Sequence, residues 1–449
     1  MMFPSRRRSG AVGRFALVVL AGGYLGGCTD ESGPAGPAVE GRVAPPDAGT
    51  AADGRPATEE EEPQGPPPAD PADQPLVGLS AAGRELFDKG DKLFERTFAV
   101  PEGLGPLYIQ ASCDACHANA GSGPGSVQKF QVVDATTGVP LADAPELAYG
   151  RTERPFVVAG ALQPLIAPAV PLPGHTLVHS RRIGPSVTGR GYIEAVLDSE
   201  IERGAAEQAT RTDGIHGRIN RVTYHSRSIP GVTIAHDYQE TGLIGRFGLK
   251  ARVATIDDFA ADAFQGDMGL TSPLRPEELP NPDGLTDDLK PGPDLSADMV
   301  IATAAYVRTL EIPPRTGAAS HAEIGGAAFA AADCSVCHVP GLRTRRDFPV
   351  VQLADLPAPI YSDLLLHDMG DELADRQTDE SAGPRDWRTA PLIGLRFQTA
   401  YLHDGRAATI EVAILKHAGP GSEANGSVAK FRALPLAQRA ALLAFVQGL

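Results

Sequence analysis

The pattern C-x-x-C-H occurs twice in this sequence, first in "ASCDACHANAG" and again in "DCSVCHVPG". Two thiols one helical turn apart, followed at once by an imidazole, suit covalent attachment of haem. The thiols form thioethers with the porphyrin, and the histidine ligates the iron. We therefore predict two covalently bound haem c groups. Their attachment residues are Cys113, Cys116, His117, Cys334, Cys337 and His338.

Two C-x-x-C pairs can also build a tetrahedral zinc site. Zinc ribbons usually separate their pairs by roughly 15 to 20 residues, whereas Cys116 and Cys334 stand in different halves of this chain. The remaining cysteine, Cys28, lies near the N-terminus, so none is left for a structural disulfide or a redox thiol. These features favour haem, with zinc as the alternative.

The N-terminus indicates export and a lipid anchor. Arginines at positions 6–8 precede the apolar run "RFALVVLAGGYLGGC", which is typical of a signal peptide over residues 1–27. Its Leu-Gly-Gly-Cys ending resembles a bacterial lipobox, so we expect Cys28 to be lipidated; a secreted chain with one odd cysteine is the alternative. Thr29 favours sorting to the outer membrane. Residues 28–76, rich in Pro, Ala, Gly and Glu, predict a disordered tether between this lipid anchor and a periplasmic body.

The chain is acidic, with a formal net charge of −16 over 449 residues. This charge excludes nucleic acid as a partner. It would attract a basic electron-transfer protein, although charge alone identifies none. The length allows two domains, each with its own core.

The part after the tether shows one layout twice. Each half has a leading helix, its C-x-x-C-H motif, an Arg-x-x-Pro segment (from Arg182 or Arg388), a helix opened by Ala-Thr-Ile and an acid, and a closing apolar helix. Long Gly/Pro-rich connections join these elements, and few strands are expected. Two prolines in "EIPPRTGAAS" separate the halves. We therefore predict mostly α domains at residues 77–315 and 316–449.

The Ala-Thr-Ile helix of the second half carries a histidine on its apolar face. Thr409 can cap this helix, and Ile410, Ala413 and His417 then share one side with Ile414. An imidazole that faces a core needs a partner, and a haem iron would provide one. The alternative is a core histidine bonded to the backbone.

The matching helix of the first half lacks that histidine. Thr255 can cap it, with Asp258 at the capping-box position. Aligning Ile256 with the first residue of the other helix puts Ala263 where His417 stands. Because alanine cannot ligate iron, one haem should have two protein ligands and the other a sixth position open to peroxide or another small ligand.

Further segments carry a family resemblance: "GPSVTGRGYIEAV", "GRFGLKARVATIDDFAADAFQGDMG", "HDMGDELAD" and "WRTAPLIGLRFQTAYLHDGRAATIEVAILKHAG". With them, the chain resembles the di-haem oxidoreductases, labelled peroxidase or thiol oxidoreductase, and the wider group of bacterial di-haem cytochrome c peroxidases and MauG. The resemblance runs from about residue 78 to the C-terminus. It implies two cytochrome-c-like haem domains with long irregular connections. The thiol label fits poorly, because no free cysteine remains.

The resemblance also implies roles for single residues. In the relatives, the sixth ligand of the C-terminal haem is a Met or Tyr on the helix that follows a His-Asp-Gly turn. His417 has the matching spacing from His403, the histidine of that turn, so the resemblance implies that His417 is this ligand. Asp267 in "GDMG" takes the place of the relatives' distal Glu, where a carboxylate can move a proton between the peroxide oxygens. The alternatives are that Asp267 caps a turn or that Met268 ligates haem 1. Met369 could compete with His417.

Trp387 and Arg388 are expected near haem 2. Arg388 could pair with a propionate, and Trp387 could relay electrons or be an ordinary core residue. We expect His367 to be a local hydrogen-bonding residue, like His403. Calcium between the domains, known in the relatives, is doubtful because Ile183 replaces their Asn.

These observations predict a lipid-anchored periplasmic oxidoreductase. Haem 1, in the first half, would activate hydrogen peroxide or a related oxidant. Haem 2, with two histidine ligands, would relay electrons from an electron-transfer protein, or oxidising equivalents would act on a protein substrate. The alternative is a di-haem electron-transfer cytochrome without catalytic activity.

Overall fold

The structure, a computed structural model, describes residues 73–118, 126–141, 147, 150–161, 173–229, 235–281 and 291–449. The expected signal peptide, Cys28 and nearly all of the tether lie outside these residues. The described residues belong to one compact unit, and its division into two haem domains stays a prediction. No helix among them is long and apolar enough to span a membrane.

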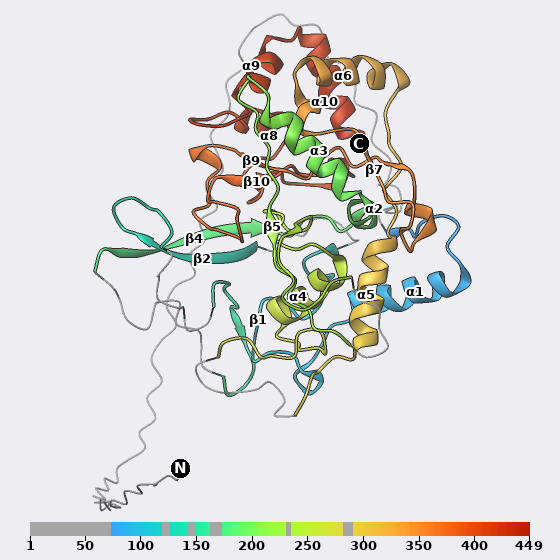
Figure 1. The fold of residues 1–449 in the computed structure, drawn as a ribbon, viewed down its shortest axis with the longest axis vertical. Helices are drawn as coiled ribbons and strands as arrows, with labels where there is room; N and C mark the ends of the chain where they lie inside the picture. Colours follow the sequence, from blue (N-terminus) through green and yellow to red (C-terminus); the bar gives the residue numbers. More distant parts are fainter. Residues whose placement is uncertain are drawn as a thin grey trace, which may run out of the picture. The chain divides into compact units, whose positions relative to one another are not determined.

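Helices outweigh strands in the described residues, as the repeat predicted (Figure 1). Four helices begin at a hydroxyl that accepts a backbone N–H, the usual N-cap arrangement. The caps are Ser80, Thr255, Ser296 and Thr409. The helices are α1 (Ala81–Glu95), α2 (Arg190–Ala195), α3 (Asp198–Ala209), α4 (Ile256–Met268), α5 (Ala297–Thr309), α6 (Ala319–Ala331), α7 (Cys334–Cys337), α8 (Ile410–Lys416), α9 (Asn425–Ala433) and α10 (Leu436–Gln447).

The leading helix of each half packs on the closing helix of the same half, α1 on α5 and α6 on α10. A glycine permits both contacts. A Cβ at Gly90 would clash with the carbonyl of Ala302, and a Cβ at Gly325 would clash with the carbonyl of Ala441. Because the backbones meet at these glycines, the repeated layout extends from the sequence to the packing.

The expectation of few strands is wrong at one place. β2 (Ser126–Asp134) pairs antiparallel with β4 (His175–Ile183) over nine residues, and the ribbon is visible beside the helices in Figure 1. The buried side of β4 includes the polar residues Ser180 and Arg182. The sequence therefore lacks the alternation of apolar and polar residues by which a strand is recognised. The short strand pairs are β1 (Leu107–Tyr108) with β3 (Phe156–Val157), β5 (Arg221–Val222) with β6 (Leu243–Ile244), β7 (Leu342–Arg343) with β8 (Pro357–Ala358), and β9 (Leu366–Asp368) with β10 (Asp386–Arg388).

A buried ionic cluster joins residues of the two halves. The Lys250 ammonium lies 3.0 Å from Asp375 Oδ1, and Arg182 Nη2 lies 2.6 Å from Asp375 Oδ2. Lys250 also donates to the carbonyls of Gly383 at 2.8 Å and Asp386 at 3.0 Å. These contacts fix the segment that leads into β10.

Candidate functional site

The two C-x-x-C-H motifs have the same local backbone. His117 N–H donates to the carbonyl of Cys113 at 2.9 Å, and His338 N–H donates to the carbonyl of Cys334 at 2.9 Å. Each motif is therefore one helical turn that ends at its histidine. The motifs line different cavities, an arrangement that does not bring the two cysteine pairs into one tetrahedral zinc site.

A cavity of about 290 Å³ lies beside the second motif. Its lining includes both cysteines and the histidine of that motif. Helix α8 contributes the apolar face anticipated above, including His417, which follows the last helical residue as the C-cap. The residues from the motif and α8 are Cys334, Cys337, His338, Ile410, Ala413, Ile414 and His417.

Backbone carbonyls orient both imidazoles of this cavity. His338 Nδ1 lies 3.1 Å from the carbonyl of Tyr361, and His417 Nδ1 lies 2.7 Å from the carbonyl of Ala413. A neutral ring that donates from Nδ1 keeps its lone pair on Nε2, the nitrogen used for a metal. Burial, helped by the neighbouring His417, lowers the pKa of His338 to about 4. Burial also lowers the pKa of His417. Both rings therefore stay neutral, the state in which an imidazole can bind a metal ion.

A cavity of about 430 Å³ lies beside the first motif, whose cysteines and histidine are part of its lining. Helix α4 contributes Ala263, Asp267 and Met268. No second histidine is among the described residues that line this cavity. The N-cap Thr255 accepts the N–H of Asp258 at 3.3 Å, but the expected capping box is incomplete. The Asp258 carboxylate instead accepts from Ser226 at 2.7 Å and from Arg275 at 2.8 Å.

Two ionisable side chains of this cavity have pKa values near neutrality. Burial raises the pKa of Asp267 to about 6, although Lys129 acts in the opposite direction. Burial lowers the pKa of Lys129 in β2 to about 8. Lys129 could not be picked out from the sequence, because no motif or recognised strand marks it. Met268 is only 3% exposed and packs in an apolar cluster while also lining the cavity.

The guanidinium groups of Arg190 and Arg388 line both cavities. Arg388 is buried and Arg190 is half-buried. Arg190 Nε donates to the carbonyl of Ser186 at 2.8 Å. Arg388 donates to the carbonyls of Gly248 at 3.1 Å and Thr389 at 3.2 Å. Neither makes an ion pair with a carboxylate of the described residues. Burial lowers the pKa of Arg190 to about 9 and that of Arg388 to about 10.

Buried cations without an anion are costly, so these cavities suit a ligand that carries carboxylates. Haem carries two propionates and therefore fits. Arg388 was predicted from the sequence, whereas Arg190 was missed. Its position five residues after Pro185 gives no sign that its side chain lines a cavity.

Trp387 lines the second cavity and is tightly held. Its indole N–H donates to the carbonyl of Leu373 at 2.8 Å. Its ring stacks on His403 with 3.9 Å between centroids, and Lys250 Nζ lies 4.2 Å from its centroid. Burial lowers the pKa of His403 to about 4, so the stacked imidazole is neutral. Arg388, the next residue in the chain, lines both cavities, so Trp387 lies close to the wall that the cavities share.

Met369 and His367 also line the second cavity. Gly370 follows Met369 with φ of 76° and caps the short helix Asp371–Leu373. The ligand atoms of Cys337, Asp363 and His367 lie within 4.8 Å of one another, close enough to hold a small metal ion if the cysteine were free. His367 was expected to be a local hydrogen-bonding residue. It does bond to Asp363, four positions earlier, but it also bonds to Glu423, 56 positions later.

Several solved structures are similar to this chain at low identity, and these likenesses carry no conclusion on function. The hydrazine synthase of Kuenenia stuttgartiensis is 13% identical, with a TM-score of 0.36, and the match covers 88% of this chain and 100% of that chain. A MauG-like protein associated with microbial copper homeostasis is 16% identical, with a TM-score of 0.30 and coverage of 57% and 89%. The diheme peroxidase BthA of Burkholderia thailandensis is 13% identical, with a TM-score of 0.29 and coverage of 72% and 95%.

No curated protein matches the chain. The profile of a family described as "Di-haem oxidoreductase, putative peroxidase" matches residues 174–449. The match begins later than residue 78, where the resemblance was expected to start, so the first haem motif lies outside it. Because the profile covers more than half of the sequence, the chain belongs to the di-haem oxidoreductase family, for which haem is the implied cofactor.

Proposed function

We propose that this protein is a peroxidase-like oxidoreductase with two covalently bound haem c groups. One observation carries the proposal. The equivalent helices α4 and α8 present Ala263 to the first cavity and His417 to the second. In this proposal haem 2 has the ligands His338 and His417. Haem 1 has His117 and a sixth position that a peroxide can occupy.

The residues of the first cavity would bind and protonate the substrate. When bound, haem supplies the electron transfer and the site at which a peroxide coordinates. The Asp267 carboxylate would accept the proton of the inner peroxide oxygen and return it to the outer oxygen, which then leaves as water. Arg190 and Arg388 would hold haem propionates, and Trp387 would lie on the electron path between the cavities.

The cellular setting belongs to the same proposal. Covalent haem attachment takes place outside the cytoplasm, and the N-terminal sequence has the pattern of a signal peptide. We place the protein in the periplasm, anchored to the outer membrane through a lipid on Cys28. An electron-transfer protein or a protein substrate would dock there, and calcium is not required by the proposal.

Electron paramagnetic resonance of the ferric, haem-loaded protein tests the proposal. We expect one high-spin signal from haem 1 and one low-spin signal from haem 2, with the high-spin signal altered by peroxide. Two low-spin signals that peroxide leaves unchanged would instead support the electron-transfer cytochrome. Met268 favours that second function, because it lines the first cavity and could ligate iron.

Replacing Asp267 with asparagine is expected to slow the reaction with peroxide by about 100-fold, the scale of general acid–base catalysis. The native rate should rise as pH increases through about 6, because Asp267 must be ionised to accept a proton and burial raises its pKa to about 6. In Asp267→Asn this rise should disappear. Stopped-flow absorbance from pH 5 to 8 measures both effects.

Asp114→Asn is the matched control. Asp114 is next to Cys113 in the chain but does not line the cavity. Its variant should keep both the native rate and the native pH profile. An unchanged pH profile in Asp267→Asn would remove Asp267 from the proton path.

A further inference from the structure

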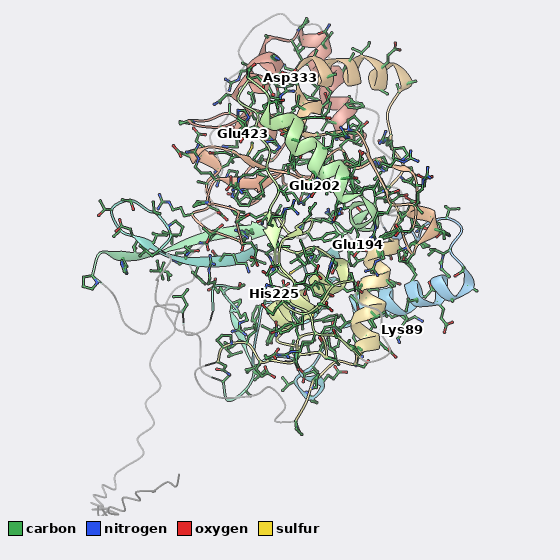
Figure 2. All side chains as sticks on the ribbon, viewed as in Figure 1. Lys89, Glu194, Glu202, His225, Asp333 and Glu423 are labelled. Carbon is green, nitrogen blue, oxygen red and sulfur yellow. The ribbon has the colours of Figure 1, made fainter. Side chains whose placement is uncertain are left out.

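A buried triad of Asp363, His367 and Glu423 lies beside the second haem motif. His367 Nε2 is 3.0 Å from Asp363 Oδ2, and His367 Nδ1 is 2.7 Å from Glu423 Oε2. The side chains of His367 and Asp363 are each 3% exposed, and that of Glu423 is 15% exposed. Figure 2 labels Glu423 in the C-terminal half, where it also accepts the N–H of Asp368 in β9.

The geometry defines the charge of this triad. Each ring nitrogen of His367 faces a carboxylate oxygen, so each must carry a proton and the ring is an imidazolium. Although burial opposes it, Asp363 holds the pKa of His367 well above its usual value. Two carboxylates and one imidazolium leave a net charge of −1. Because the side chains of Asp363 and His367 are almost fully buried, solvent and salt screen this charge only weakly.

The triad is in contact with the haem-attachment turn. His367 Nδ1 lies 3.8 Å from Cys337 Sγ, and Asp363 N–H donates to the carbonyl of Cys337 at 2.8 Å. Gln208 Nε2 fixes the carboxylate further by donating to Asp363 Oδ2 at 2.8 Å. His367 and Glu423 also line the cavity itself. The negative charge is therefore held at one place relative to the motif.

We propose that the Asp363–His367–Glu423 triad lowers the reduction potential of haem 2. This inference rests on the proposed function, since it requires haem bound at Cys334 and Cys337. A fixed negative charge stabilises the oxidised iron, which carries one more positive charge than the reduced iron. The three side chains act through their charge and not by contact with the reacting oxidant. Of the three, the His367 side chain touches the attachment turn, and Asp363 and Glu423 bind its two ring nitrogens.

Redox titration of the haem-loaded protein, followed by absorbance and electron paramagnetic resonance, tests the inference. At about pH 5 an imidazole of ordinary pKa is protonated, so Asp363→Asn and Glu423→Gln each remove one negative charge there without loss of the His367 proton. The midpoint potential of haem 2 should therefore shift upward in both variants. The potential of haem 1 should stay unchanged in the same samples. Glu372→Gln is the matched control, because Glu372 is exposed and its charge is screened by water; it should shift neither potential.

Two results would overturn the inference. One is an unchanged or lowered haem 2 potential in both carboxylate variants, each checked for native haem content and thermal unfolding. If one variant does not fold, the other decides. The second is one bound zinc per protein with Cys337 unattached to haem, which would identify Cys337, Asp363 and His367 as a metal site. Neither result depends on peroxide turnover. If the haem 2 potential shifts as expected but the native protein has no peroxidase activity, the proposed function is rejected and the inference on the triad stands.

Discussion

Replacing Ala263 with histidine is expected to close haem 1 to peroxide. Ala263 stands on α4 at the position that His417 occupies relative to α8, and both line a haem cavity. A histidine held there competes with peroxide at an effective concentration far above that of any added substrate, so the rate should fall by about 100-fold or more. The high-spin resonance signal should disappear, and stopped-flow absorbance should show the slower reaction.

Two further variants separate ligation from simple crowding. Ala263→Leu adds bulk without a ligand, so it should retain the high-spin signal even if peroxide binds more weakly. His417→Ala is the mirror change and should convert haem 2 from low spin to high spin. A high-spin signal that survives in Ala263→His would show that α4 does not present this position to the iron. The proposed difference in ligands between haem 1 and haem 2 would then be wrong.

Features with a local pattern could be predicted from the sequence. The hydroxyl caps at Thr255 and Thr409 depend on residues within one helical turn, and both form. The apolar face of α8 has helical spacing, and its residues line one cavity. The attachment motifs are local as well, because Cys, Cys and His lie within five consecutive positions.

Features that depend on distant partners could not be predicted. Arg182 meets Asp375 across 193 positions, and His367 meets Glu423 across 56 positions. No spacing rule links such residues, and a polar buried strand lacks the apolar alternation by which strands are recognised. Arg190 resembles any surface arginine until the fold places it in the walls of both cavities. The electrostatics around the cavities therefore emerge only from the tertiary structure.

Replacing Lys250 with methionine is expected to lower the free energy of unfolding by about 3 kcal/mol, the scale for removing one partner of a buried ion pair. Lys250 is fully buried, and its ammonium binds Asp375 and backbone carbonyls of residues 383–386. Methionine fills similar space but leaves those oxygens without a donor. Urea unfolding followed by circular dichroism measures the change.

Lys430→Met is the control for this prediction, because Lys430 pairs with Asp333 at the surface and its side chain is 51% exposed. This change should lower the free energy of unfolding by less than about 1 kcal/mol, the scale of an exposed ion pair. Trp387 is the only tryptophan and lies 4.2 Å from the Lys250 ammonium, so its fluorescence reports on the same region. Equal losses in the two lysine variants would mean that the ammonium does not hold the segment before β10. A larger loss in Lys250→Met, with Trp387 exposed before global unfolding, would show that it also holds the wall between the cavities.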